Sequence, residues 1–283
     1  MKLLRVGEFR KEKPAVQLAD GHVVDVSSKV RDFDSAFFED GGLEKLKGIV
    51  KLDLPSIDLA GKRLGSPIAR PYKVLGIGLN YADHAKESNM PIPPEPVVFT
   101  KASNTVVGPN DTVLIPRASK KTDWEVELGV VIGKTARYLA DKDSALSYVA
   151  GYCISNDVSE REFQLERGGS WDKGKSAETF NPLGPWLVTT DEIPDPQVLG
   201  MSLDVNGVRR QTGNTKTMVF NVKHLVWYLS QFMVLEAGDV ITTGTPPGVG
   251  LGQKPNPIYL KEGDVMELAI DGLGKQRQVC KQA

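Results

Sequence analysis

The order of apolar and polar positions along the chain predicts many short strands. Alternating or continuous apolar runs bounded by Gly, Pro, Asn and Asp are typical of strands. Such runs occur at residues 2–9, 15–27, 74–80, 97–100, 111–115, 122–133, 151–157, 185–189, 201–206, 239–243 and 265–270. The turn formers Asp20 and Gly21 interrupt the run at 15–27, which favours a hairpin there.

Helical spacing of apolar residues is confined to a few segments. They are 40–50, a polar helix start at 81–87, 141–150, a helix from Ser159 to Gly168, and 221–233. Ser159 and Glu162 have capping-box spacing, and Asn221 stands at an N-cap position. Most strands do not alternate with helices, so the pattern predicts a β-rich α+β fold with a mixed roll, and not a doubly wound parallel sheet.

A connector divides the chain into two parts. Residues 61–71 are rich in turn formers and basic residues, as expected for a linker. We therefore expect a small N-terminal α/β domain at 1–70 and a larger domain at 71–283.

Three acidic residues stand out because they belong to apolar strands. Glu125 and Glu127 are two residues apart at the start of the run at 122–133 and so share one face of the strand. Burying both as carboxylates is costly unless a cation or a proton compensates, although an edge strand with solvent-facing glutamates is an equal alternative for this pair alone. Asp157, at the end of the next apolar strand, favours the buried arrangement. Three carboxylates without nearby His or Cys predict Mg²⁺ or Mn²⁺, with Ca²⁺ as a further option, over zinc.

A candidate base lies in the polar helix start. His84 and Glu87 are three residues apart, so they share a helix face and can form a hydrogen bond. A carboxylate that holds one ring nitrogen makes the other a better base for activating water. An exposed histidine beside a helical glutamate is common, so this pair alone is weak support. The nearby Gly76 and Gly78 lack the third glycine of a dinucleotide loop, and a nucleotide site is not predicted.

Composition limits the class of partner. The 283 residues are 40% hydrophobic and 25% charged, which is ordinary for a globular protein. With 35 Lys and Arg against 36 Asp and Glu, the net charge is -1, so neither nucleic acid nor an anionic membrane is an expected partner. Two cysteines, no leader-like start and no apolar run near the ~20 residues of a membrane span predict a soluble cytoplasmic protein that acts on a small molecule.

Five motifs in fixed order resemble the fumarylacetoacetate hydrolase family. The motifs are Asn80-Tyr81-x-x-His84-Ala85-x-Glu87, Glu125-x-Glu127-Leu128-x-Val130-Val131-Ile132-Gly133, Asn156-Asp157-Val158-Ser159-x-Arg161, Lys173-Gly174-Lys175-Ser176 and Thr243-Gly244-Thr245-Pro246. The resemblance covers roughly residues 72–280. It implies a mixed β-roll catalytic domain, a homodimer, and a bound Mg²⁺, Mn²⁺ or Ca²⁺.

The same resemblance implies roles for nine residues. The implied metal ligands are Glu125, Glu127 and Asp157, and the implied catalytic residues are His84, Glu87 and Lys175. The residues implied to contact carboxylate and keto oxygens of the substrate are Arg161, Gln164 and Thr245. Larger fumarylacetoacetases bring a further aspartate to the metal near the position of Asn80, so a neutral Asn80 implies a site with three carboxylates.

The implied activity is metal-dependent hydrolysis of a C–C bond in a 2,4-diketo acid. Water deprotonated by His84 would attack C4, the C3–C4 bond would break, and Lys175 would stabilise the oxyanion or protonate carbon. A 2,4-diketo-3-deoxy sugar acid such as diketo-deoxy-fuconate or diketo-deoxy-rhamnonate would give pyruvate and a hydroxy acid. The alternatives are a ureidoglycolate lyase, an oxaloacetate decarboxylase and a non-catalytic protein that binds a small 2-oxo acid.

Overall fold

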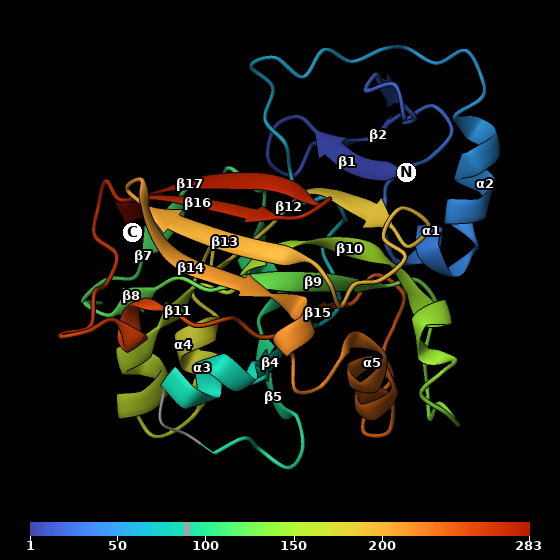
Figure 1. Cartoon of the computed structure of the whole chain (residues 1–283). Coiled ribbons are helices and arrows are strands. Elements are labelled where there is room, and N and C mark those ends of the chain that lie inside the picture. The colour runs from blue at the N-terminus through green and yellow to red at the C-terminus, as the bar shows by residue number, and fades with distance from the viewer. Residues whose placement is uncertain (88–90) are drawn as a thin grey trace.

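The computed structural model describes residues 1–87 and 91–283, and its largest element is a ten-stranded mixed sheet (Figure 1). From one edge to the other, the strands are β3 (Val23–Asp25), β2 (Lys13–Gln17), β1 (Lys2–Val6), β12 (Asn181–Thr189), β10 (Val149–Asn156), β9 (Val126–Ile132), β15 (Val240–Thr242), β4 (Val74–Gly78) and β5 (Val97–Lys101), with β6 (Val106–Val107) beside β12.

A second sheet has five strands. In order they are β14 (Val208–Asn214), β13 (Gly200–Val205), β16 (Val265–Ile270), β17 (Gly274–Gln282) and β7 (Val113–Ile115). A small ladder joins β8 (Thr122–Asp123) to β11 (Ser159–Glu160). Most neighbouring strands are antiparallel, whereas β15 with β4, β12 with β6, and β17 with β7 are parallel. The chain therefore has the strand-rich α+β fold with mixed sheets that its sequence predicts.

The helices are short. They are α1 (Ser35–Glu39), α2 (Gly42–Ile49), α3 (Ala82–Glu87), α4 (Trp171–Lys175) and α5 (Val222–Ser230), with single turns η1 (Ser103–Thr105), η2 (Ala145–Tyr148), η3 (Glu162–Glu166), η4 (Thr215–Thr217) and η5 (Gly250–Gly252). The predicted cap of α5 is confirmed, because the Asn221 side chain accepts a 3.0 Å hydrogen bond from the backbone N–H of His224. Among the helices of the described chain, none has the length and apolar character needed to cross a bilayer.

The main core lies between the two large sheets. Leu128 and Val130 of β9 pack in the same apolar cluster as Leu203 of β13 and Leu268 of β16. The other face of the ten-stranded sheet buries Val131 in a second cluster that includes residues of α1 and α2. Since β9 is covered on both faces, all seven of its residues are buried, which explains its continuous apolar sequence.

The N-terminal segment extends the large sheet at one edge. Strand β1 pairs antiparallel with β12 through Lys2 with Val188 and Leu3 with Leu187. The predicted hairpin of β2 and β3 continues the sheet beyond β1. In Figure 1 these strands lie with α1 and α2 on the N-terminal side of the molecule. The helix expected at 40–50 is α2.

The helix predicted at 141–150 is wrong. Only η2 is helical, and β10 begins at Val149 between β9 and β12. A Cβ on Gly151 would lie 2.2 Å from the backbone oxygen of Val188, so the residue suits this close strand approach. Pairing with two distant strands therefore outweighs the local helical spacing.

The helix predicted to start at Ser159 is also wrong. Ser159 and Glu160 form β11, and the Ser159 hydroxyl donates to the backbone oxygen of Asp157 at 2.9 Å instead of capping a helix. Glu160 is fully buried, and its carboxylate accepts a 2.9 Å hydrogen bond from the Thr122 hydroxyl. This contact ties Glu160 to β8, so the helical turn η3 begins only at Glu162.

Candidate metal centre and active site

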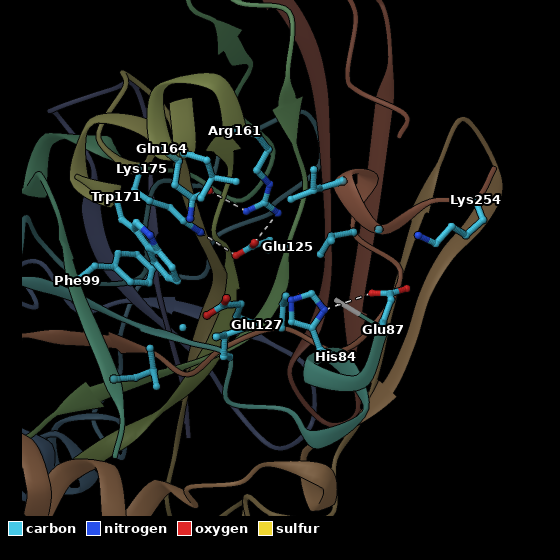
Figure 2. Close-up of a pocket in the computed structure, with 18 residues that line it drawn as sticks. His84, Glu87, Phe99, Glu125, Glu127, Arg161, Gln164, Trp171, Lys175 and Lys254 are labelled. Carbon is cyan, nitrogen blue, oxygen red and sulfur yellow. Dashed lines mark hydrogen bonds and ion pairs between the residues drawn. The ribbon is translucent and has the colours of Figure 1, made fainter. Parts of the chain in front are cut away.

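A cavity of about 320 Å³ lies at the end of β4 and β9, beside α3 and α4 (Figure 2). Its walls bring together residues from distant parts of the chain. They are Ile77, Gly78, Leu79, His84, Glu87, Phe99, Glu125, Glu127, Arg161, Gln164, Leu165, Trp171, Lys175, Thr245, Val249, Leu251, Gly252 and Lys254. A concave site of this size, in which apolar side chains surround converging polar and charged groups, is typical of small-molecule binding.

The three predicted acids meet in one buried cluster. Glu125, Glu127 and Asp157 each offer a carboxylate oxygen, and these oxygens lie within 4.8 Å of one another. The acids meet because β9 and β10 pair antiparallel, with Ser155 opposite Glu127, and because the Asp157 N–H donates to the Glu125 backbone oxygen at 3.0 Å. Strand pairing therefore brings together carboxylates thirty residues apart.

Glu125 is neutralised by two cations. Its Oε2 accepts from Lys175 Nζ at 2.9 Å, and its Oε1 accepts from Arg161 Nη2 at 2.6 Å. Burial alone would raise the pKa of Glu125, but the charges and hydrogen bonds of Lys175 and Arg161 outweigh burial and lower that pKa. Glu125 is therefore a carboxylate in the folded protein.

Asp157 also contacts two lysines. Lys175 Nζ donates to its Oδ2 at 2.7 Å, and Lys101 Nζ donates to its Oδ1 and, at 3.1 Å, to the Val158 backbone oxygen. Sequence reasoning missed Lys101, which ends β5 and is buried. Lys101 follows the apolar Phe99 by two residues, so the two side chains share one face of the strand. This spacing could have indicated that Lys101 is buried.

Glu127 differs from Glu125 and Asp157, because no cation within residues 1–87 or 91–283 contacts its carboxylate. Its Oε2 accepts from the Thr242 hydroxyl at 2.6 Å and from the Gly244 N–H at 2.8 Å. Its Oε1 accepts no hydrogen bond from the part of the chain that the structure describes. Burial, followed by the neighbouring Asp157 and Glu125 charges, raises the pKa of Glu127 well above its usual value.

These contacts fit a hard divalent cation. With Asp123, which contacts Arg161, the buried group has four acids and three cations, Lys101, Lys175 and Arg161, so it carries one net negative charge when every acid is ionised. A divalent ion would place positive charge beside Glu127. It would also give the buried group a net positive charge, which favours binding of an anionic ligand. An oxygen-only donor set suits Mg²⁺ or Mn²⁺.

His84 and Glu87 form the predicted pair on α3. His84 Nδ1 lies 3.3 Å from Glu87 Oε2, and both side chains are largely buried. Both Glu87 oxygens also accept 3.1 Å hydrogen bonds from the Gly248 N–H, which fixes the carboxylate. Burial would raise the pKa of Glu87, but the His84 and Gly248 hydrogen bonds lower it overall. Figure 2 shows the His84 ring between Glu87 and the acid cluster.

The residues expected to contact substrate all line the cavity, and each has a protein partner. Arg161 Nη1 donates to Gln164 Oε1 at 3.0 Å, and the Thr245 hydroxyl donates to the Val126 backbone oxygen at 3.0 Å. Arg161 Nε donates to Asp123, a residue to which sequence reasoning gave no role. Their contacts with substrate stay predictions.

Asn80 does not line the cavity. Its amide nitrogen donates to the backbone oxygens of Phe220 at 3.0 Å and Thr243 at 2.8 Å, and its oxygen accepts from the Phe220 N–H at 2.8 Å. Asn80 therefore joins three chain segments behind the site, in agreement with an acid cluster of three carboxylates.

The fold and the cavity together define a class of protein: a strand-rich protein with a buried acidic cluster suited to a divalent cation beside a histidine–glutamate pair. The chain belongs to the fumarylacetoacetate hydrolase family. The sequence profile of the fumarylacetoacetate (FAA) hydrolase C-terminal family matches residues 73–280. Members of this family are enzymes, among them hydrolases and isomerases.

Proteins similar over their full length support this assignment. A Burkholderia ambifaria protein, provisionally named a hydrolase, is 56% identical over 283 residues and covers 100% of both chains. A fumarylacetoacetate hydrolase structure from Exiguobacterium antarcticum has a TM-score of 0.86 and 37% identity, with 100% of both chains covered. The maleylpyruvate hydrolase of Sphingobium sp. SYK-6, solved with manganese(II) and pyruvate, has a TM-score of 0.82 and 28% identity, also with 100% of both chains covered.

Proposed function

We propose that the protein is a metal-dependent hydrolase that cleaves the C3–C4 bond of a 2,4-dioxo acid and releases pyruvate. One observation carries the proposal: two acids of the cluster, Glu125 and Glu127, line the same cavity as the His84–Glu87 pair. A divalent cation held by Glu125, Glu127 and Asp157 would supply a template for the 2-oxo acid head and an electrophile for its keto oxygen. Manganese and pyruvate in the similar maleylpyruvate hydrolase support this choice.

The remaining chemistry belongs to protein side chains. Glu87 holds Nδ1 of His84, so Nε2 is free to take a proton from water, and the resulting hydroxide adds to the C4 carbonyl. The C3–C4 bond then breaks, C4 leaves as a carboxylic acid, and C3 keeps the electron pair. Protonation of C3 by His84 or Lys175 completes pyruvate. Lys175 and Arg161 supply positive charge beside the developing oxyanion.

The experiment compares His84→Gln with the wild type on two substrates. Hydrolysis of a 2,4-dioxo acid should lose roughly 10²–10⁴ in kcat, because a general base is removed, while Mn²⁺ binding measured by calorimetry persists. Decarboxylation of oxaloacetate needs no attacking water and should be largely retained. His22→Gln is the matched control, since His22 is exposed on the N-terminal hairpin.

Equal retention of both reactions by His84→Gln would refute the hydrolase mechanism. A substrate panel extends the test to the acids that the sequence favours, the 2,4-diketo-3-deoxy sugar acids, and to ureidoglycolate, whose cleavage releases urea. Pyruvate release from a 2,4-dioxo acid without urea or CO₂ formation supports C–C hydrolysis. We further propose that the enzyme is a cytoplasmic homodimer. Size-exclusion chromatography with light scattering tests whether two chains associate.

A further inference from the structure

A second cavity, of about 360 Å³, lies between β1 and the turn η1. Residues of β1 and the loop after it, of the connector at 61–71 and of the η1–β6 segment line this cavity. Within the described residues, it shares no lining residue with the cavity beside the acid cluster. Its volume falls within the roughly 300–1,000 Å³ of small-molecule sites. It is therefore a candidate for a ligand other than the one bound at the acids.

Four arginines line this second cavity, and two of them are neutralised by protein acids. Glu12, whose side chain is largely buried, contacts Arg5 Nη2 at 3.5 Å and Arg63 Nη1 at 2.7 Å. Arg5 also contacts Asp32 at 2.6 Å, and Arg63 also contacts Asp111 at 2.6 Å. These three acids compensate the charges of Arg5 and Arg63, so these two arginines form part of the frame of the cavity.

The other two arginines, Arg10 and Arg70, are exposed and keep their charge available. Neither forms an ion pair with any residue in 1–87 or 91–283. Arg70 Nε donates to the Ser103 hydroxyl at 3.0 Å, which orients the guanidinium group and leaves both Nη groups for a ligand. The Arg10 guanidinium lies over the ring of Phe9, 5.1 Å from its centroid. Both arginines are thus held by neutral groups, and an anion can bind them without displacing a carboxylate.

The cavity wall also holds a buried hydroxyl without a protein partner. Ser66 is 6% exposed, and its Oγ forms no hydrogen bond with any atom of residues 1–87 or 91–283. Arg5 Nη1 donates to the backbone oxygens of Ser66 at 3.4 Å and Ile68 at 3.5 Å, which fixes this part of the connector. A buried hydroxyl without a partner destabilises a fold, so an acceptor atom of a ligand explains the hydroxyl of Ser66.

This set of donors suits a phosphate group. A phosphate monoester carries a charge of about −1.5 to −2 at pH 7 and three acceptor oxygens, so it can pair with both available guanidinium groups and accept from the Ser66 hydroxyl at once. Arginine pairs with phosphate through parallel hydrogen bonds. The rest of the wall includes Phe9, Ile68 and Val106, which suit an organic group attached to the phosphate.

From these contacts we propose that this cavity is a second ligand site, in which Arg10, Arg70 and Ser66 bind the phosphate group of a small phosphorylated metabolite. None of the three residues belongs to the acid cluster or to the His84–Glu87 pair. The inference therefore does not depend on the proposed function, and its test needs no turnover.

The first test compares ligands with and without phosphate. Calorimetry on the full chain, in EDTA so that no metal ion binds the phosphate, pairs glucose 6-phosphate with glucose and AMP with adenosine at constant ionic strength. At least one ester should bind on the order of tenfold more tightly than its unphosphorylated partner. Inorganic phosphate should bind more weakly than that ester, because it has no organic group to contact Phe9 and Ile68.

The second test locates the phosphate. Arg10→Gln and Arg70→Gln should each weaken binding of the ester on the order of fivefold, the upper range for a partly exposed ion pair, and the double variant should weaken it more than tenfold. Arg70→Lys should retain part of the affinity, since the charge remains while the paired hydrogen bonds are lost. Arg137→Gln is the matched control, because Arg137 is exposed and does not line this cavity.

Ser66→Ala separates a ligand contact from a structural role. Because the hydroxyl has no partner among the described residues, its removal should leave thermal stability unchanged or higher while binding of the ester weakens several-fold. A loss of stability with unchanged affinity for the ester would overturn the role of Ser66.

Three outcomes would overturn the whole inference. The first is that neither ester binds, and the second is that each ester binds no more tightly than its unphosphorylated partner or than inorganic phosphate. The third is unchanged affinity in the double variant of Arg10 and Arg70, which would place the phosphate elsewhere on the protein.

Discussion

Asp123 and Arg161 form a buried ion pair in which Arg161 Nε donates to Asp123 Oδ2 at 2.8 Å. The same carboxylate accepts the N–H groups of Gly250 and Leu251, so it joins the substrate-side arginine to the loop that carries Lys254. Burial alone would lower the pKa of Arg161, but the Asp123 and Glu125 charges raise it overall. Through this pair, the buried Arg161 is connected to the loop of Gly250 and Leu251 in the cavity wall.

Asp123→Asn should destabilise the protein by about 3 kcal/mol, because removing one partner of a buried ion pair leaves the other charge poorly compensated. Equilibrium unfolding in urea measures the loss. Asp204→Asn is the matched control, since Asp204 contacts Arg209 on an exposed part of β14, where an ion pair contributes at most about 1 kcal/mol. Similar losses in the two variants would contradict a structural role for the buried pair.

Mn²⁺ should stabilise the folded chain through the acid cluster. At a concentration about 100-fold above its dissociation constant, the ion contributes about 2.7 kcal/mol, which corresponds to a rise in Tm of roughly 4–5 °C for a chain of this size. Glu127→Gln should abolish most of this rise, whereas Glu267→Gln, on an exposed position of β16, should keep it. A full Mn²⁺ effect in Glu127→Gln would exclude Glu127 as a ligand.

Glu87 should make stability depend on acid pH. Its folded-state pKa lies below the usual 4.5, so its carboxylate stabilises the folded state above that pH, and this contribution is lost as the pH falls through the lowered pKa. Glu87→Gln should therefore be less stable than the wild type near neutral pH, and the difference should shrink below about pH 4.5. Denaturant unfolding across pH 3–7 tests this, with Glu267→Gln as the control for loss of a surface charge.

Gly78 should be sensitive to a single added methyl group. A Cβ at this position would lie 2.4 Å from Cζ3 of Trp171, a residue of the cavity wall. Gly78→Ala should cost roughly 1–3 kcal/mol as Trp171 shifts, and ligand binding should weaken with it. Gly48→Ala, in α2 with open space around the added carbon, should instead stabilise by about 0.5–1 kcal/mol. Equal thermal stability of the two variants would contradict the close packing at Gly78.

The sequence by itself determined the elements whose signals are local. The turn formers at Asp20 and Gly21 predicted the β2–β3 hairpin, and Asn221 predicted the start of α5. The apolar run of β9 predicted a buried strand, and the two-residue spacing predicted that Glu125 and Glu127 share one face of it; both residues line the cavity. For the turn and the cap, neighbouring residues carry both the pattern and the interaction that causes it.

Only the tertiary structure decided the elements and contacts that depend on distant partners. Strand β10 includes the last two residues of the helix predicted at 141–150 because β9 and β12 pair with it, and Glu160 joins β8 because its carboxylate is buried there. Strand β17 is polar in sequence, but its Gln276 and Gln278 are buried and donate to backbone oxygens such as those of Ile154 and Pro109. Lys101 likewise gains its role only where β5 brings it to Asp157. A buried polar group is tolerated only where a partner forms a hydrogen bond or an ion pair with it. In these cases the partners lie 38 to 169 residues away along the chain.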